Sequence, residues 1–199
     1  LIVQLYAELA KIDKKKVYLK SSSKVFKKVM EDNLDVDMTD HLAVCWSGEW
    51  SWCDSLFMGP PAFAKLYDVT GDKKYLDFMN RKWWKAHRFL YDRAEMLFYR
   101  NAGYFNKKEI NGEKVFLSRA NGAVMAKVSS IQQEDGFWRA SLLDPASFSG
   151  GETTGTGLFC YALAWGINNG LLNEKNYSPI VKKSINALMR SVDADGKVG

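Results

Sequence analysis

Residues that build metal sites and disulfide frameworks are scarce in this chain, which has three cysteines and two histidines among 199 residues. Cys45, Cys53 and Cys160 show neither a CxxC pair nor the spacing of zinc ligands, so we interpret them as buried thiols. His41 and His87 are too isolated to suggest a metal site, and neither follows a recognisable catalytic spacing. The sequence therefore predicts neither a bound metal nor a cofactor.

Long apolar runs are also missing from the chain. None approaches the roughly 20 residues that a membrane-spanning helix requires, so we expect no membrane partner. The N-terminal segment LIVQLYAELAKIDKKK carries its lysines after the apolar stretch, which is the reverse of a signal peptide. The run GGETTGTG is not a phosphate-binding loop, because no lysine follows its glycines.

The formal net charge of +5 fits two kinds of partner, a nucleic acid or a small anion. The lysines are scattered and no nucleic-acid-binding motif accompanies them, so we interpret them as solvated helix faces and expect no nucleic-acid partner. A mildly basic surface also raises the local concentration of anions, which is compatible with an anionic substrate such as a uronic acid.

Helical periodicity is what the chain has in abundance, and its 47% apolar content is enough for a sizeable core. Apolar residues at helical spacing recur within 2–9, 63–67, 76–83, 158–165 and 181–189. A turn at Gly71 joins the second and third stripes, and Asn169-Gly170 is expected to end the fourth. Ser178-Pro179 is expected to open the last helix. The pattern predicts an all-α array of helical hairpins.

Three segments break this pattern and are expected to form loops at one rim. Asn111-Gly112 lies between two apolar-rich arms, which is a strong signal for a tight hairpin turn. Glycine and polar residues cluster within 132–145 and 147–157, the latter directly before an apolar helix. The expected N-cap of that helix is one of three threonines, Thr153, Thr154 or Thr156.

The most informative segment, residues 46–79, places one carboxylate among tryptophans directly before a helical hairpin. Trp46, Trp50 and Trp52 offer flat apolar faces on which a pyranose ring can stack. Asp54 beside them is expected to be partly desolvated, so that it stays protonated to a higher pH. A tryptophan-rich core in which Asp54 merely caps a helix fits the same residues.

Four ordered motifs carry a family resemblance. They are WCDSLFMGPPAFAKLYDVTGDKKYLDF, LFYRNAGYF, DGFWRASLLDPASF and ETTGTGLFCYALAWGINNGLL, within residues 50–199. In this order they closely resemble the unsaturated rhamnogalacturonyl hydrolases of glycoside hydrolase family 105. The resemblance implies an (α/α)6 toroid of helical hairpins with its active site in a funnel at one end. It also implies a pectin-derived oligosaccharide substrate with a 4,5-unsaturated uronic acid at the non-reducing end.

The chemistry that the resemblance implies is hydration of a double bond, not attack at the anomeric carbon. An aspartic acid protonates the C4 side of the C4=C5 bond, water adds at C5, and the product opens and expels the remaining sugar. Asp54 matches one of two family aspartates, and Asn101 is the nearest match to the second. An amide cannot transfer a proton at neutral pH. A shifted alignment, a diverged or inactivated member, or a partnership of Asp54 with Glu95 or Glu109 would each account for this.

The resemblance also marks substrate-binding candidates along the chain. They are Trp50, Trp52, Arg119, Trp138, Arg139, Glu152 and His41. Arg119 or Arg139 would hold the uronate carboxylate through a bidentate contact, although an ordinary ion pair is the commoner use of an arginine. Glu152 would lie at the substrate-facing rim, with stabilisation of a helix dipole as its structural alternative. Near Arg119, Ala120 and Ala123 replace a glycine and a tryptophan of family members, which would weaken sugar stacking.

Length sets one further expectation, because a complete toroid of twelve helices needs far more than 199 residues. We expect one toroid domain over residues 1–199 from which segments are missing, either because separate segments are joined near 128–131 or because the gene product is shortened. The alternatives are an oligosaccharide-binding toroid that is catalytically inactive or has an altered specificity, and a scaffold for protein partners. The resemblance implies a bacterial periplasm or cytoplasm without choosing between them, and the oligomeric state is left open.

Overall fold

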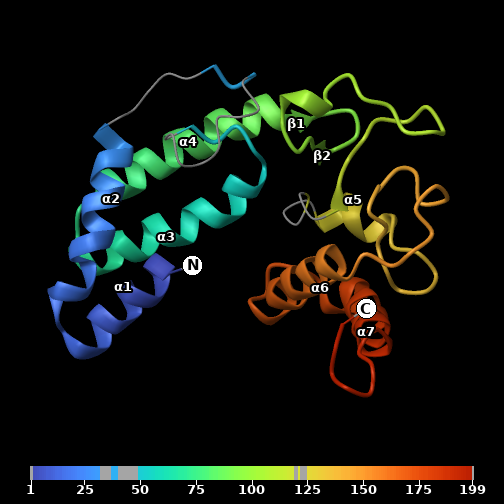
Figure 1. The fold of residues 1–199 in the computed structure, drawn as a ribbon. Coiled ribbons are helices and arrows are strands. Elements are labelled where there is room, and N and C mark those ends of the chain that lie inside the picture. The colour runs from blue at the N-terminus through green and yellow to red at the C-terminus, as the bar shows by residue number, and fades with distance from the viewer. Residues whose placement is uncertain (1, 32–36, 40–48, 119–120, 122–124, 199) are drawn as a thin grey trace. The chain divides into compact units, whose positions relative to one another are not determined.

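The protein is seen here as a computed structural model (Figure 1). It describes residues 2–31, 37–39, 49–118, 121 and 125–198. They form two compact units: unit 1 is Leu1–Tyr91 with Asn101–Gly103, and unit 2 is Asp92–Arg100 with Tyr104–Gly199. Each unit has its own buried apolar cluster. Among the helices in the described ranges, none is both long and apolar enough to cross a membrane.

Unit 1 consists of helices. They are α1 (Ile2–Asp13), the 3-10 helix η1 (Lys16–Leu19), α2 (Lys20–Glu31), α3 (Asp54–Thr70) and α4 (Lys74–Leu90). α3 and α4 pack side by side as the predicted hairpin (Figure 1). Gly71 ends α3 in the left-handed conformation, with φ 72°, and its amide donates to the Tyr67 carbonyl at 2.7 Å. Glycine adopts this conformation without a Cβ clash, so the predicted turn is confirmed.

Phe63 of α3 lies at the centre of the core of unit 1. Its ring stacks on Phe78 of α4 with 5.2 Å between centroids, and it meets Phe26 of α2 edge-on at 4.8 Å. Trp50, which precedes α3, has its ring centroid 6.1 Å from that of Phe63. Aromatic pairs of this kind contribute about 0.5–1.5 kcal/mol each beyond burial. The cluster fixes α3, and therefore the residues that begin it, against α4.

The remaining elements belong to unit 2, apart from Tyr91 and the first two residues of η3, which belong to unit 1. They are β1 (Tyr91–Asp92), β2 (Leu97–Phe98), the 3-10 helix η3 (Ala102–Tyr104), α5 (Met125–Ser130), α6 (Thr153–Asn168) and α7 (Glu174–Arg190). β1 and β2 pair in a two-stranded sheet, and α6 and α7 form a second helical hairpin. α6 ends as predicted, with Asn169 as its C-cap and Gly170 at φ 68°. Trp138, Phe159 and Leu163 are fully buried in the core of this unit.

The predicted hairpin turn at Asn111-Gly112 is confirmed. Gly112 has φ 86°, its amide donates to the Glu109 carbonyl at 3.0 Å, and an antiparallel bridge joins Lys108 to Lys114. The Asn111 side chain donates to a backbone carbonyl 32 residues further along the chain at 3.0 Å. This turn is therefore held to the loop that precedes α6.

The predicted start of α7 is wrong by about one helical turn. The helix begins at Glu174, and Pro179 lies inside it. Asn173 is the N-cap, because its side chain accepts a hydrogen bond from the Asn176 amide at 3.3 Å. A capping side chain satisfies an otherwise free N–H of the first turn, and this outweighs the signal from Ser-Pro further along.

Candidate active site

The segment that leads into α3 exposes two side chains and buries the rest. From residue 49 to residue 55, every residue is buried except Trp52 and Asp54, which are half-buried. An aromatic ring and a carboxylate are thus the groups of this segment that keep part of their surface accessible to solvent. They are two of the residues that the sequence marks for sugar chemistry.

Asp54 is the first residue of α3 and is not its cap. The N-cap is Cys53, which makes no side-chain capping hydrogen bond. The Cys53 thiol instead lies 3.8 Å from the Asp54 Oδ2 atom and donates to it. The structural alternative, in which Asp54 serves as the N-cap of α3, is therefore wrong.

Trp50 and Trp52 have different surroundings although they are two residues apart. Trp50 is 3% exposed and belongs to the core around Phe63. Gly59 lies against its indole so closely that a Cβ added there would be 2.5 Å from two ring carbons. A sugar needs an accessible ring face on which to stack, and a ring that is 3% exposed offers none, so we leave Trp50 out of the candidate site and keep Trp52.

A buried carboxylate that the sequence reasoning missed lies five residues before Asp54. Glu49 is 0% exposed, and each of its carboxylate oxygens meets a lysine of α4. Lys82 Nζ donates to Oε1 at 2.5 Å, and Lys85 Nζ donates to Oε2 at 2.7 Å. The signal that could have found this contact is a pair of lysines three residues apart on a helix, because such residues share one face.

The position expected to hold a second acid is buried and is occupied by an amide. Asn101 is 6% exposed, and its Oδ1 atom accepts a hydrogen bond from the Gly103 amide at 3.0 Å. Of the two acids considered as replacements, Glu95 lies 3.7 Å from the Lys114 ammonium, and Glu109 lies in the turn of the rim hairpin. Glu95 and Glu109 both belong to unit 2.

Trp138 and Arg139 of unit 2 make internal contacts. Trp138 is fully buried, and its indole N–H donates to the Val128 carbonyl at 2.8 Å. Arg139 forms a bidentate pair with Asp135, with nitrogen–oxygen distances of 2.7 and 3.3 Å. Burial by itself raises the pKa of Asp135, but the hydrogen bonds from Arg139 and the Phe137 amide outweigh it and lower the pKa. The ion pair is the structural alternative named for this arginine, and its binding of a uronate stays a prediction.

Glu152 caps α6, so the prediction of a threonine N-cap is wrong. Its Oε2 atom accepts hydrogen bonds from the Gly155 amide at 2.5 Å and from the Ser118 hydroxyl at 2.9 Å. The carboxylate thus satisfies a free N–H of the first turn and ties the start of α6 to Ser118, which precedes α5 in the chain. His41, Arg119 and Trp46 lie outside the described residues.

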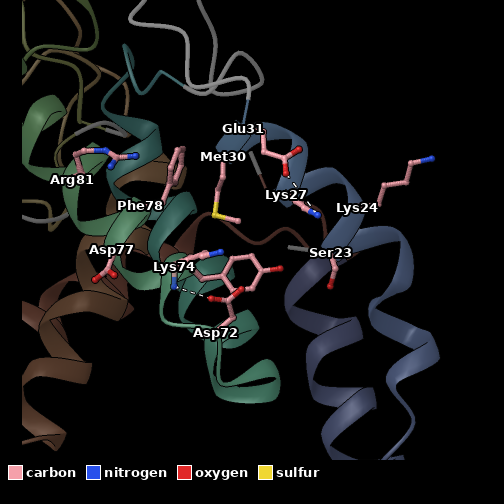
Figure 2. A pocket seen from close by; sticks show the side chains of 11 residues that line it. Ser23, Lys24, Lys27, Met30, Glu31, Asp72, Lys74, Asp77, Phe78 and Arg81 are labelled. Carbon is pink, nitrogen blue, oxygen red and sulfur yellow. Dashed lines mark hydrogen bonds and ion pairs between the residues drawn. The ribbon is translucent and has the colours of Figure 1, made fainter.

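A cavity of about 600 Å³ lies elsewhere in unit 1 (Figure 2). It is lined by side chains of α2 and of the start of α4, among them Lys27, Glu31, Lys74, Phe78 and Arg81. These side chains carry charges of both signs, and Lys27 pairs with Glu31 at 3.7 Å. The cavity is lined by residues from the turn and the first part of α4, and neither Trp52 nor Asp54 lines it. It is not part of the candidate site.

The α3–α4 and α6–α7 hairpins are typical of all-α domains of the (α/α)6-toroid type, and comparison with known proteins gives the same class. The sequence profile of Glycosyl Hydrolase Family 88 matches residues 1–131 and 123–199. The chain belongs to glycosyl hydrolase family 88.

Individual proteins of similar sequence or structure also include glycoside hydrolases. The unsaturated 3S-rhamnoglycuronyl hydrolase of Alteromonas sp. (strain LOR) is 37% identical over 177 residues, which cover 75% of this chain and 43% of that protein. A solved family 88 glycosyl hydrolase from Bacteroides vulgatus has a TM-score of 0.84 and 35% identity, over 99% of this chain and 62% of that chain. The present chain therefore spans less than half the length of the Alteromonas relative.

Family 105, which the motifs resemble, is represented among the similar structures. A possible family 105 member from Klebsiella pneumoniae has a TM-score of 0.75 at 15% identity, over 98% of this chain and 59% of that chain. This likeness shows the fold alone. The predicted fold class, an all-α (α/α)6 toroid, is confirmed, and the family shown is 88.

Proposed function

We propose that this chain is part of a hydrolase that removes a 4,5-unsaturated uronic acid from the non-reducing end of pectin-derived oligosaccharides. Family membership and the name of the Alteromonas relative, an unsaturated 3S-rhamnoglycuronyl hydrolase, support an unsaturated uronyl group as the part recognised. The observation that carries the proposal is the half-buried pair of Trp52 and Asp54 within a segment that is otherwise buried.

Asp54 acts as the acid in this proposal. Its carboxyl proton goes to C4 of the C4=C5 double bond, and a water oxygen forms the new bond at C5. The proton that the water loses returns to the carboxylate, so the acid is regenerated. The hydrated C5 carries two oxygens and opens to a ketone, and the former ring oxygen leaves a hemiacetal at C1 that releases the remaining sugar. Trp52 provides an apolar face beside the acid for the sugar ring.

Asn101 limits the rate in this proposal, because its amide can neither donate nor accept a proton in place of a second acid. Asp54 then has to serve as both acid and base. Asn101→Asp should raise turnover, since an aspartate keeps the acceptor oxygen that the Gly103 amide uses in the structure. If the alignment of this loop is shifted, the same substitution should have no such effect.

The experiment follows the ultraviolet absorbance of the conjugated unsaturated uronate, which is lost on hydration. Pectin-derived and 3S-rhamnoglycuronyl unsaturated disaccharides are the two substrates. We expect Asp54→Asn to lower kcat at least about 100-fold, the usual contribution of an acid or base catalyst. Asp68→Asn is the matched control, because Asp68 is an exposed residue of the same helix and its ion pair with Lys11 lies at the solvent-exposed surface, where such pairs contribute little. Full activity in Asp54→Asn would refute the assignment.

A toroid that binds oligosaccharide without catalysis is the second candidate, and the amide at Asn101 is the observation that favours it. Calorimetric binding of either disaccharide to the parent chain, with no loss of absorbance, would support this candidate. Activity gained by Asn101→Asp on that background would identify the missing acid.

A further inference from the structure

Glu49 is a buried charge whose contacts have a geometric consequence for the candidate site. The carboxylate is 0% exposed and is shared between two ammonium groups, at 2.5 Å from Lys82 and 2.7 Å from Lys85. The Lys82 side chain is 5% exposed and that of Lys85 is 35% exposed. One carboxylate therefore joins the segment before α3 to two points on α4.

The two lysines contact this carboxylate from the same face of α4. They are three residues apart, so their side chains lie on the same face of α4. The Lys82 ammonium also lies 5.5 Å from the centroid of the Phe78 ring, which stacks on Phe63 in the core. The position of Lys82 is thus set by packing, and Glu49 is held to it.

Stability alone is a poor explanation for this arrangement. Removing the Glu49 carboxylate and the Lys82 ammonium from water is expensive, and buried ion pairs are often no more stabilising than apolar residues of similar volume. What such a pair does provide is a single arrangement of the groups that carry it, because any shift leaves a buried charge without its partner.

We propose that Glu49 is a positioning residue, which fixes the segment of Trp52 and Asp54 by fastening it to α4 through Lys82 and Lys85. Four residues separate Glu49 from Asp54, and three of these four are buried, so little slack remains between the fastened carboxylate and the start of α3. The catalytic part of this inference rests on the proposed function of Asp54. Misplacement of a reacting group by about 1 Å can cost about 100-fold in rate, so a loosened segment should be visible in kcat.

Glu49→Gln tests the inference with a side chain of the same size. The amide cannot pair with two ammonium groups, so we expect faster amide hydrogen exchange in residues 50–56 with unchanged exchange in α7. On an unsaturated disaccharide we expect kcat to fall about tenfold or more while KM stays within about twofold. Lys85→Met is the second variant, because it removes the half-exposed partner and leaves Glu49 paired with Lys82.

Asp92→Asn is the control, since it converts another paired carboxylate to an amide in the other unit. A loss of kcat in Glu49→Gln no larger than in this control, or exchange that rises evenly across both units, would overturn the positioning role. If the parent chain turns over neither disaccharide, the proposed function fails. Selective opening of residues 50–56 would still support the fastening by Glu49, and unchanged exchange there would refute it.

Discussion

Lowering the pH should reduce the unfolding free energy of unit 2, because the Asp92 carboxylate becomes protonated. Asp92 accepts hydrogen bonds from the Lys114 ammonium at 2.8 Å and from the Tyr99 hydroxyl at 2.9 Å, and its side chain is 12% exposed. Burial by itself raises the pKa of Asp92. The hydrogen bonds from Lys114, a backbone amide and Tyr99 outweigh it and lower the pKa from 3.8 to about 2. The folded protein therefore holds this carboxylate in its charged form.

The size of the effect follows from that pKa. Because the folded pKa lies below the unfolded one, Asp92 contributes stability that is present above the unfolded value and is lost as pH falls through 3.8 towards about 2. A pKa lowered by this amount corresponds to about 2 kcal/mol of unfolding free energy. That is a substantial share of the roughly 5–15 kcal/mol by which domains are stable.

The assay is urea unfolding followed by circular dichroism at a series of pH values, for the parent chain and Asp92→Asn. The parent should be more stable by about 2 kcal/mol near neutral pH, and this difference should shrink to a small fraction of that by about pH 2. Carboxylates away from Lys114 titrate equally in both proteins and cancel in the difference, whereas Glu95 shares that lysine and does not. A difference that stays constant from about pH 6 to about pH 2 would refute the role assigned to the Lys114 and Tyr99 contacts.

Two further predictions concern packing and capping. Gly59→Ala should cost about 1–3 kcal/mol of unfolding free energy, because its Cβ would lie 2.5 Å from ring carbons of Trp50. Gly157→Ala, where nothing lies within 4 Å, should leave the thermal midpoint unchanged or raise it, and the opposite order would refute the packing argument. Glu152→Ala should cost about 0.5–2 kcal/mol as a lost cap, without a change in KM. Asn173→Ala, which removes the other cap, is its control, and a raised KM in Glu152→Ala alone would return this residue to the substrate-binding rim.

Predictions of turns from a few neighbouring residues were correct where the segment contained a single turn signal. The turn at Gly71 and the hairpin at Asn111-Gly112 were predicted correctly, because a left-handed glycine is a property of the local backbone. The start of α7 was wrong because Asn173 and Ser178-Pro179 compete as helix openers only a few residues apart. The sequence contains both signals, and the packing of the helix decides which of them is used.

The sequence by itself determined the class of this protein: apolar periodicity predicts hairpins of helices, and its motifs carry the family likeness. Only the tertiary structure decided which residues of the Asp54 segment are core and which are open. Trp50 and Trp52 are alike in the sequence, yet one packs on Phe63 and the other remains half-buried. Glu49 meets its lysines across more than 30 positions of chain. Burial and ion pairing depend on which distant segments pack together, and local spacing does not contain that information.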